Sequence, residues 1–261
     1  MTRQLTPAAP ASLAAFDKMF EEVKNWGKWG EDDELGTLNY ITPDAIANAA
    51  RLVTTGKVFA LGIPLDRQGP QSGTRQRFNP IHAMFRDGGD APRTPDEVAA
   101  MEGYGGSDDW IVMPLQCATQ WDSLAHIFYD GKMYNGYDAT LVTSTGAARN
   151  SIFKTRDKIV GRGCSPGVSV YTAQWMHEKQ IAAVASDNYA VEVRPSEVRG
   201  FRNPFHVVAI ANMGLTLGEI FYLEQLAADC AADGRYAFLL VAPPLPVTRA
   251  VGTPINPYAL K

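Results

Sequence analysis

The apolar residues of this chain follow two patterns, helical spacing and short uninterrupted runs. Leu13, Phe16, Phe20 and Val23 recur at helical spacing and predict a short amphipathic helix near the start of the chain. Residues 1–10 carry no such pattern, and we expect them to form a loose tail.

The helix predicted next has a well-defined start. Thr42 offers a hydroxyl as N-cap, Pro43 suits the first helical position, and Asp44 places a carboxylate at the positive end of the helix dipole. Two further helices are predicted over 173–179 and 223–232.

Short apolar runs predict the strands, which we place at 58–63, 168–170, 181–185, 207–210 and 237–241. Because strands and helices alternate along the chain, the fold class is α/β. Residues 66–110 are rich in Gly, Pro, Asp and Arg, and we expect a long surface excursion. Ordered excursions of this length often cover a binding site.

Composition narrows the class of protein. The 261 residues are 46% hydrophobic and 20% charged, as in ordinary globular proteins, so a disordered chain or a fibre is excluded and one domain over 11–261 is expected. A net charge of −4 without a basic cluster argues against nucleic acid or a membrane as partner.

The cysteines and the apolar runs indicate in which cellular compartment the protein lies. Cys117, Cys164 and Cys230 are widely spaced, which argues against a disulfide framework or a thiolate zinc site and favours a reducing compartment. No run reaches the ~18 apolar residues of a membrane span, and no signal peptide is recognisable. We expect a soluble, cytoplasmic protein.

Candidate chemistry gathers between Gln116 and His126. In an extended strand Gln116, Gln120 and Asp122 project from one face, and Asp122 can cap a helix that carries His126 one turn along. Three oxygen donors and one imidazole suit a divalent metal ion. The alternative is structural: two hydrogen-bonding glutamines and an aspartate that only caps a helix.

This segment resembles the H-x-G-T-H-x-D-x-P-x-H signature of the cyclase family of metal-dependent hydrolases, which includes kynurenine formamidase and isatin hydrolase. Gln116 and Gln120 stand at the two leading histidine positions, while Asp122 and His126 match. The Q-x-x-x-Q-x-D variant is similar to that of the trans-dienelactone hydrolase branch. Further blocks resemble the family at 29–39, 128–136, 186–192 and 206–256.

The resemblance adds two residues to the site. His206 matches the family's later histidine and Glu219 its later carboxylate, and both belong to the metal pocket in relatives. Without the resemblance, His206 would be interpreted as a buried histidine entering a strand. Glu219 would be interpreted as an exposed acid at a helix start.

The resemblance also implies a fold: a swivelling β/β/α domain with a mixed central sheet, associated as homodimers or homotetramers. One departure stands out, because relatives carry several dozen additional residues where this chain has only 158–167. We therefore expect a fold shortened near 160–167, with an incomplete core behind the site.

Three residues are candidates for lining a substrate pocket. His82 and Phe85 lie in the Gly/Pro-rich excursion, and Tyr129 follows the signature segment. The alternatives are a loop role for His82 and packing roles for the two aromatic rings.

The resemblance thus implies a metal-dependent hydrolase of a small lactone, cyclic amide or N-formyl aryl amine, of the kind that serves aromatic degradation or tryptophan catabolism. His126 is the expected general base, and Glu219 completes or bridges the site. The predicted ligands of a zinc or manganese ion are Gln116, Gln120, Asp122 and His206. The alternative is a catalytically degenerate paralogue that binds a small molecule.

Overall fold

The computed structural model describes residues 13–73, 76–90, 94–102, 104–163 and 168–261; the predicted tail and Cys164 lie outside them. Contacts divide the chain into two compact units, which we call the main unit (1–63 and 119–261) and the inserted unit (64–118). We predicted one domain over 11–261, so this division is a feature that the hydrophobic pattern did not indicate.

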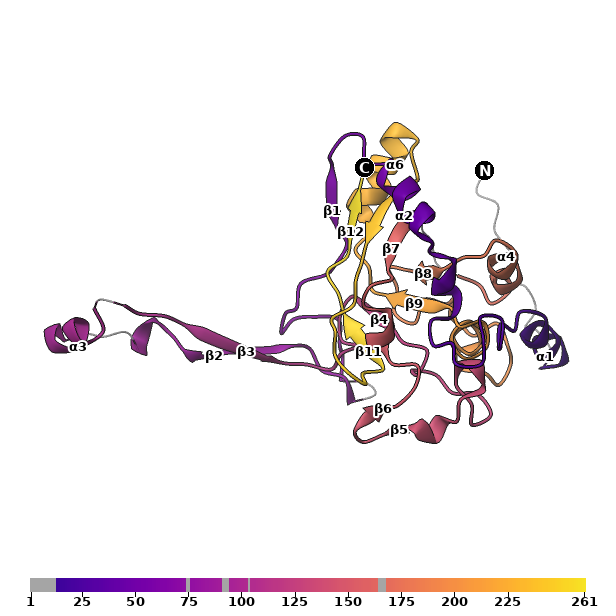
Figure 1. Cartoon of the computed structure of the whole chain (residues 1–261), viewed down its shortest axis with the longest axis horizontal. Coiled ribbons are helices and arrows are strands. Elements are labelled where there is room, and N and C mark those ends of the chain that lie inside the picture. The colour runs from indigo at the N-terminus through magenta and orange to yellow at the C-terminus, as the bar shows by residue number, and fades with distance from the viewer. Residues whose placement is uncertain (1–12, 74–75, 91–93, 103, 164–167) are drawn as a thin grey trace. The chain divides into compact units, whose positions relative to one another are not determined.

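The main unit contains two four-stranded sheets (Figure 1). The first is antiparallel, in the order β1 (Val58–Ala60), β12 (Tyr258–Leu260), β10 (Phe238–Val241) and β7 (Val160–Gly163). The second has the order β11 (Gly252–Pro254), β4 (Gln120–Asp122), β9 (Thr216–Glu219) and β8 (Ala183–Ala185). Because β8 runs parallel to β9 while the other pairs are antiparallel, this second sheet is mixed, as predicted. A short hairpin joins β5 (Val142–Thr143) to β6 (Gly146–Ala147).

The helices of the main unit are α1 (Leu13–Glu22), α2 (Pro43–Ala50), α4 (Thr172–Glu178), α5 (Pro204–His206), a π-helix (Val207–Met213) and α6 (Glu224–Asp233). Single 3₁₀ turns occupy Gly36–Tyr40, Tyr134–Gly136, Ala139–Leu141 and Ile152–Thr155. The predicted start of α2 is confirmed, because the Thr42 hydroxyl accepts a hydrogen bond from the backbone N–H of Ala45. The α/β class is therefore confirmed.

Two predicted strands are wrong. The run 207–210 is helical. Val208, Ala209 and Ile210 are fully buried, and a helix with so little exposed surface carries no amphipathic signal. This helix ends at Gly214, whose φ of 67° is left-handed and whose position leaves no room for a Cβ beside the Tyr134 ring. The run 168–170 forms only a single bridge, between Val168 and Glu192.

The strands β4 and β9 separate two apolar clusters of the main unit. Leu217 of β9 and Phe205 belong to one cluster, and Trp121 of β4 and Phe221 belong to the other. Trp121 and Phe221 meet edge to face, with their ring centroids 5.3 Å apart. Gly218, opposite Trp121 in register, is required there because a Cβ would come within 2.5 Å of the indole.

An apolar cavity of about 380 Å³ lies beside the segment 158–167, whose shortening relative to the family stays a prediction. Strand β7 lies within that segment and β8 follows it along the chain; each is at the edge of its sheet, and both line the cavity. Its buried walls include Leu61, Trp121, Ile159, Met176, Phe221 and Phe238. Residues 164–167 of the segment lie outside the described residues.

The inserted unit holds more regular structure than the expected excursion. Strands β2 (Ile81–Arg86) and β3 (Asp108–Val112) pair antiparallel, with an irregularity between Met84 and Arg86. A 3₁₀ turn (Gly88–Asp90) and the helix α3 (Pro95–Ala100), which starts with a capping box at Thr94, lie between them. Within the described residues, no helix has the length and apolar character needed to cross a membrane.

Candidate metal centre

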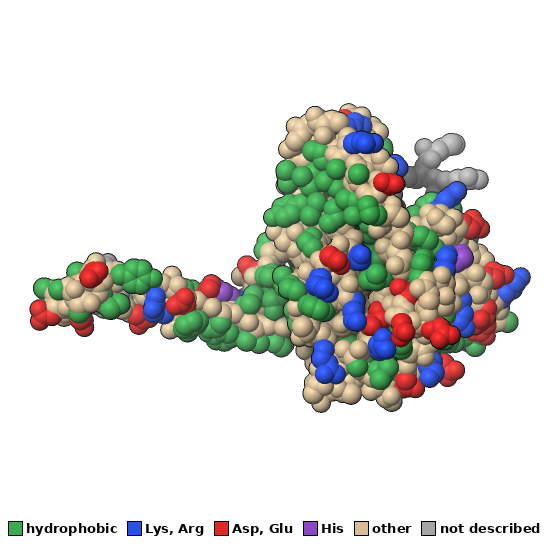
Figure 2. Space-filling view, viewed as in Figure 1, with side chains coloured by type: hydrophobic (Ala, Val, Ile, Leu, Met, Phe, Trp, Pro, Cys, Tyr) green, Lys and Arg blue, Asp and Glu red, His purple; other side chains and the backbone are tan. Residues whose placement is uncertain are grey.

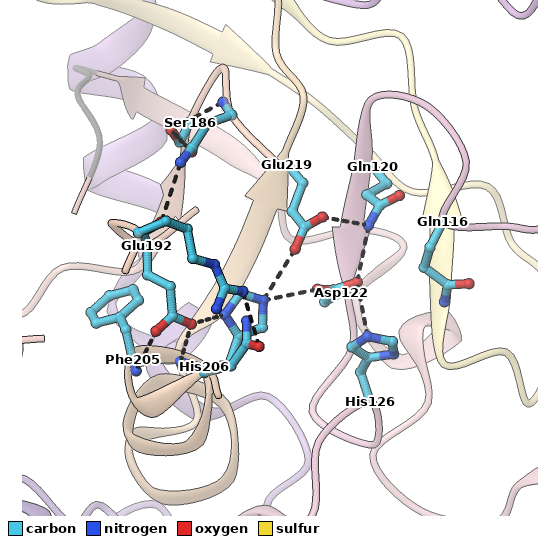
Figure 3. A network of polar contacts seen from close by, with 12 residues as sticks. Gln116, Gln120, Asp122, His126, Ser186, Glu192, Phe205, His206 and Glu219 are labelled. Carbon is cyan, nitrogen blue, oxygen red and sulfur yellow. Dashed lines mark hydrogen bonds and ion pairs between the residues drawn. The ribbon is translucent and has the colours of Figure 1, made fainter. Parts of the chain in front are cut away.

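Two neighbouring strands bring two carboxylates together. In the antiparallel pair β4–β9, Gln120 stands opposite Glu219, and Asp122 lies two residues farther along β4 on the same face. Asp122 is fully buried and Glu219 is 4% exposed. Figure 3 shows both carboxylates directed into one polar cluster.

An imidazole completes this cluster. His206, the last residue of α5, places its Nε2 atom 3.1 Å from Glu219 Oε1 and 3.9 Å from Asp122 Oδ2. One possible ligand atom from each residue lies within 4.8 Å of the others, and all three residues are buried. The structure thus brings together Asp122, His206 and Glu219, which the sequence had placed in one site.

Behind the imidazole lies Glu192, which the sequence analysis did not single out. Glu192 is 2% exposed, and its Oε1 atom accepts a hydrogen bond from His206 Nδ1 at 2.7 Å. Its Oε2 atom accepts a bond from the backbone N–H of Phe205 at 3.0 Å. A carboxylate on one ring nitrogen fixes the ring orientation and directs the other nitrogen to a metal. The only sequence signal was the position of Glu192 at the end of the block 186–192.

The electrostatics of the cluster follow from its carboxylates. Burial alone would lower the pKa of His206, but its hydrogen bonds to Glu192 and Glu219 and the charge of Asp122 raise that pKa to about 9. Burial would raise the pKa of Glu219, but the hydrogen bond and charge of His206 lower it. Three acidic side chains therefore surround the imidazole, and a divalent ion that took the place of the proton on His206 Nε2 would offset their negative charge.

The donor set suits such an ion. Buried carboxylate oxygens and an imidazole nitrogen are ligands of zinc and of manganese. These residues therefore fit the metal that the signature implies.

Gln120 also faces the cluster, but as a donor. Its side-chain amide nitrogen lies 3.3 Å from Glu219 Oε2 and 3.5 Å from Asp122 Oδ1. Ligation through its carbonyl oxygen needs the opposite amide orientation, which the same side chain reaches by a half-turn about its last bond. The role of Gln120 as a metal ligand stays a prediction.

His126 lies beside Asp122, with its Nε2 atom 3.8 Å from Asp122 Oδ1. The imidazole is 20% exposed, in contrast to the buried carboxylate. The predicted helix after Asp122 is wrong, because the chain forms a turn in which the backbone N–H of His126 donates to Ser123 O at 3.0 Å. This turn still directs His126 to the same side as Asp122 (Figure 3).

Gln116 belongs to the inserted unit, and the strand predicted to connect it with Asp122 is wrong. Residues 115–119 form turns and bends, so β4 begins only at Gln120. The shared parity therefore holds for Gln120 and Asp122 alone. Ligation by Gln116 stays a prediction.

The three predicted pocket residues have other contacts in the structure. His82 Nε2 lies 2.7 Å from Asp109 Oδ2 within the inserted unit, where Phe85 is 66% exposed. In the main unit, the Tyr129 ring packs against Phe20, with centroids 5.0 Å apart. Their roles in substrate binding stay predictions.

Two unusual backbone conformations adjoin the cluster carboxylates. Val191 precedes Glu192 with a φ of 56°, and Ile220 follows Glu219 with a φ of 59°. β-Branched residues rarely adopt left-handed φ, and such conformations concentrate at functional sites. This observation agrees with a site that constrains the backbone around its ligands.

Comparison with known proteins supports the assignment of a family. No protein-family model matches the sequence, and no curated protein matches it. A crystal structure described as a novel cyclase is 34% identical, with 93% of this chain and 99% of that chain covered and a TM-score of 0.82. The chain therefore belongs to the cyclase family.

A more distant structure, isatin hydrolase A from Ralstonia solanacearum, is 13% identical. The match covers 84% of this chain and 97% of that one, with a TM-score of 0.50. At this identity the likeness concerns the fold alone.

Proposed function

We propose that this protein is a metal-dependent hydrolase of a small lactone, cyclic amide or N-formyl aryl amine. The observation that carries the proposal is the buried convergence of Asp122, His206 and Glu219 on one point. Membership of the cyclase family and the polar cluster support the same class of reaction. The glutamine motif favours a lactone and the trans-dienelactone hydrolase branch.

In this proposal Asp122, His206 and Glu219 hold a zinc or manganese ion, and Gln116 and Gln120 are further ligands suggested by the motif. When bound, such an ion lowers the pKa of water towards neutrality and polarises a carbonyl group. Glu192 contributes by keeping a proton on His206 Nδ1, which leaves Nε2 available as a ligand atom.

The proposed general base is His126. Its imidazole is partly exposed, so a substrate and water can reach it, and Asp122 lies close enough to orient it. His126 takes the proton of the attacking water and then delivers it to the leaving oxygen or nitrogen. An imidazole can both accept and donate a proton, which suits the two transfers.

The test is elemental analysis of freshly purified protein, followed by hydrolysis assays with and without chelator. The substrate panel contains a small unsaturated lactone, isatin and N-formylaniline. We expect stoichiometric divalent metal and turnover of one substrate class that chelation abolishes and added metal restores. Protein that is folded, takes up no zinc or manganese and hydrolyses none of the panel would contradict the proposal.

A second candidate is a small-molecule binding protein without catalysis. The cavity of about 380 Å³ beside residues 160–163 favours it, because small-molecule sites have volumes of this order and an apolar lining. Under this alternative, the protein binds an apolar aromatic probe with or without metal and turns over no member of the panel. Chelator-sensitive turnover excludes it.

A further inference from the structure

The apolar cavity of the main unit lies on the side of β4 and β9 that faces away from the metal centre. Trp121 stands between Gln120 and Asp122 on β4, so its ring points to the opposite side of the sheet, where it lines the cavity. Phe221, which also lines the cavity, meets the Trp121 ring edge to face. No residue of the polar cluster is part of this lining. The cavity is therefore separate from the metal centre.

The lining consists of a buried apolar floor and an exposed rim. Ala183, on the edge strand β8, packs against the apolar cluster that forms the floor, and its side chain is small. Trp175, Gln180 and Arg162 line the cavity as well, but they are exposed, so the cavity opens to solvent beside them. An apolar cavity that is open to solvent and has a few polar groups in its lining is the usual form of a small-molecule site.

The volume of the cavity limits the size of its ligand. An apolar cavity of about 150 Å³ holds one benzene molecule. The volume of about 380 Å³ found here therefore leaves room for a ligand of two rings. Trp121, Phe221 and Trp175 surround this space with aromatic side chains, which pack well against other aromatic rings.

The charge of the lining adds a second property of the ligand. Of the described residues that line the cavity, Arg162 alone is charged. Within the described part of the chain, its guanidinium has no ion-pair or hydrogen-bond partner. On the face of the main unit shown in Figure 2, by contrast, basic side chains lie among acidic ones. A guanidinium binds a carboxylate through two parallel hydrogen bonds. The cavity is therefore complementary in charge to an apolar ligand that carries one carboxylate.

We infer that this cavity binds a small aromatic carboxylate, with its rings against Trp121 and Phe221 and its carboxylate on Arg162. This inference does not depend on the proposed hydrolase activity, because no residue of the polar cluster takes part in the binding. Unlike the second candidate function, it requires no loss of catalysis, since the carboxylate and a metal ion occupy opposite sides of β4 and β9.

Calorimetric titration of the full chain with 2-naphthoate tests the inference, and naphthalene-2-carboxamide serves as the neutral analogue. We expect 2-naphthoate to bind with a dissociation constant on the order of 0.1 mM or lower. The carboxamide should bind ~5-fold more weakly, because it lacks the charge that Arg162 attracts. Treatment with chelator should leave both affinities unchanged. A wild-type protein that does not bind 2-naphthoate, or binds it only with metal present, would overturn the inference.

A matched pair of variants tests the role of the charge. Arg162 and Arg199 are both exposed, but Arg199 does not line the cavity. Arg162→Gln should weaken the binding of 2-naphthoate ~5-fold and leave that of the carboxamide unchanged. Arg199→Gln should change neither affinity. The guanidinium of Arg162 has no partner to lose, so we expect the variant to fold as the wild type does. An Arg162→Gln protein that binds 2-naphthoate as tightly as the wild type would refute the assignment.

A larger side chain in β8 tests the position of the ligand. Ala183→Phe fills part of the cavity and should weaken the binding of both probes by at least ~10-fold. Ala232→Phe, at an exposed position of α6, is the control and should bind both probes normally. Circular dichroism establishes that each variant is folded. Undiminished binding by folded Ala183→Phe would place the ligand elsewhere and contradict the inference; if this variant does not fold, the comparison of Arg162→Gln with Arg199→Gln decides.

Discussion

The two faces of β4 and β9 show how differently neighbouring residues can act. On one face Gln120, Asp122 and Glu219 form a polar cluster with His206; on the other, Trp121 packs against Gly218 and Phe221. The alternation of side chains along each strand is sufficient to separate the polar residues from the apolar ones, because successive side chains point to opposite sides. The comparison teaches that substitutions on the polar face should affect chemistry, and those on the apolar face should affect stability.

The largest effect is expected from Asp122→Asn, which keeps the shape of the side chain and removes its charge. If Asp122 is a ligand, we expect hydrolysis to fall by ~10³-fold or more, since several kcal/mol of transition-state stabilisation depend on the bound ion. Metal stoichiometry should fall as well, while circular dichroism stays that of the wild type. A fully active variant would break the assignment of the polar face.

His126→Ala tests the exposed end of the same face. We expect a loss of ~10²–10⁴-fold in kcat, because a general base is removed, with metal content unchanged. His177→Ala is the matched control, since the His177 imidazole bonds Asn25 and belongs to no part of the cluster. Retained activity in His126→Ala, or an equal loss in the control, would remove His126 from the mechanism.

On the opposite face, Trp121→Ala should act on folding. Trp121 is 1% exposed and its indole N–H donates to Ala242 O at 2.9 Å, so we expect a loss of ~3–5 kcal/mol in the free energy of unfolding. Trp121→Phe keeps a ring and should lose much less. Denaturant titration measures both, and metal content of the folded fraction should equal that of the wild type. A metal-free folded fraction would show that the two faces do not act separately.

The smallest effect on function is expected at Glu192, which contacts the ligand residue His206 and not the proposed metal itself. Glu192→Gln should weaken metal affinity by ~10–100-fold, because the amide holds His206 Nδ1 less firmly than the carboxylate does. Competition with a chromogenic chelator measures the affinity. Glu197→Gln is the control, since that carboxylate accepts hydrogen bonds from Ser169 and Val170 and is not one of the residues of the cluster. Equal affinities in both variants would mean that Glu192 supports the fold and not the ligand.

Local patterns predicted parts of this structure well. The start of α2 was readable because an N-cap hydroxyl, a proline and an acid act within a single turn. The common side of Gln120 and Asp122 followed from the two-residue period of a strand. The extension of this strand to Gln116 failed, because nothing in the period marks where a chain leaves its sheet.

The strand predicted at 207–210 was wrong for a related reason. A short, almost fully buried apolar run shows neither the helical nor the strand period. Its length and flanking residues were the remaining signals, and they favoured a strand. The resemblance to a family nevertheless placed His206 and Glu219 in the site, and the structure brings both to Asp122.

By itself, the sequence determined the α/β class, the amphipathic and capped helices, and the residue types from which a metal site can be built. Each of these depends on neighbours within a few positions along the chain. Only the tertiary structure decided that Glu192 lies behind His206, that Gly218 is the residue against which Trp121 packs, and that the apolar side chains of β2 and β3 stay exposed. Those facts depend on segments far apart in sequence, whose pairing is fixed by packing and burial and not by any local period.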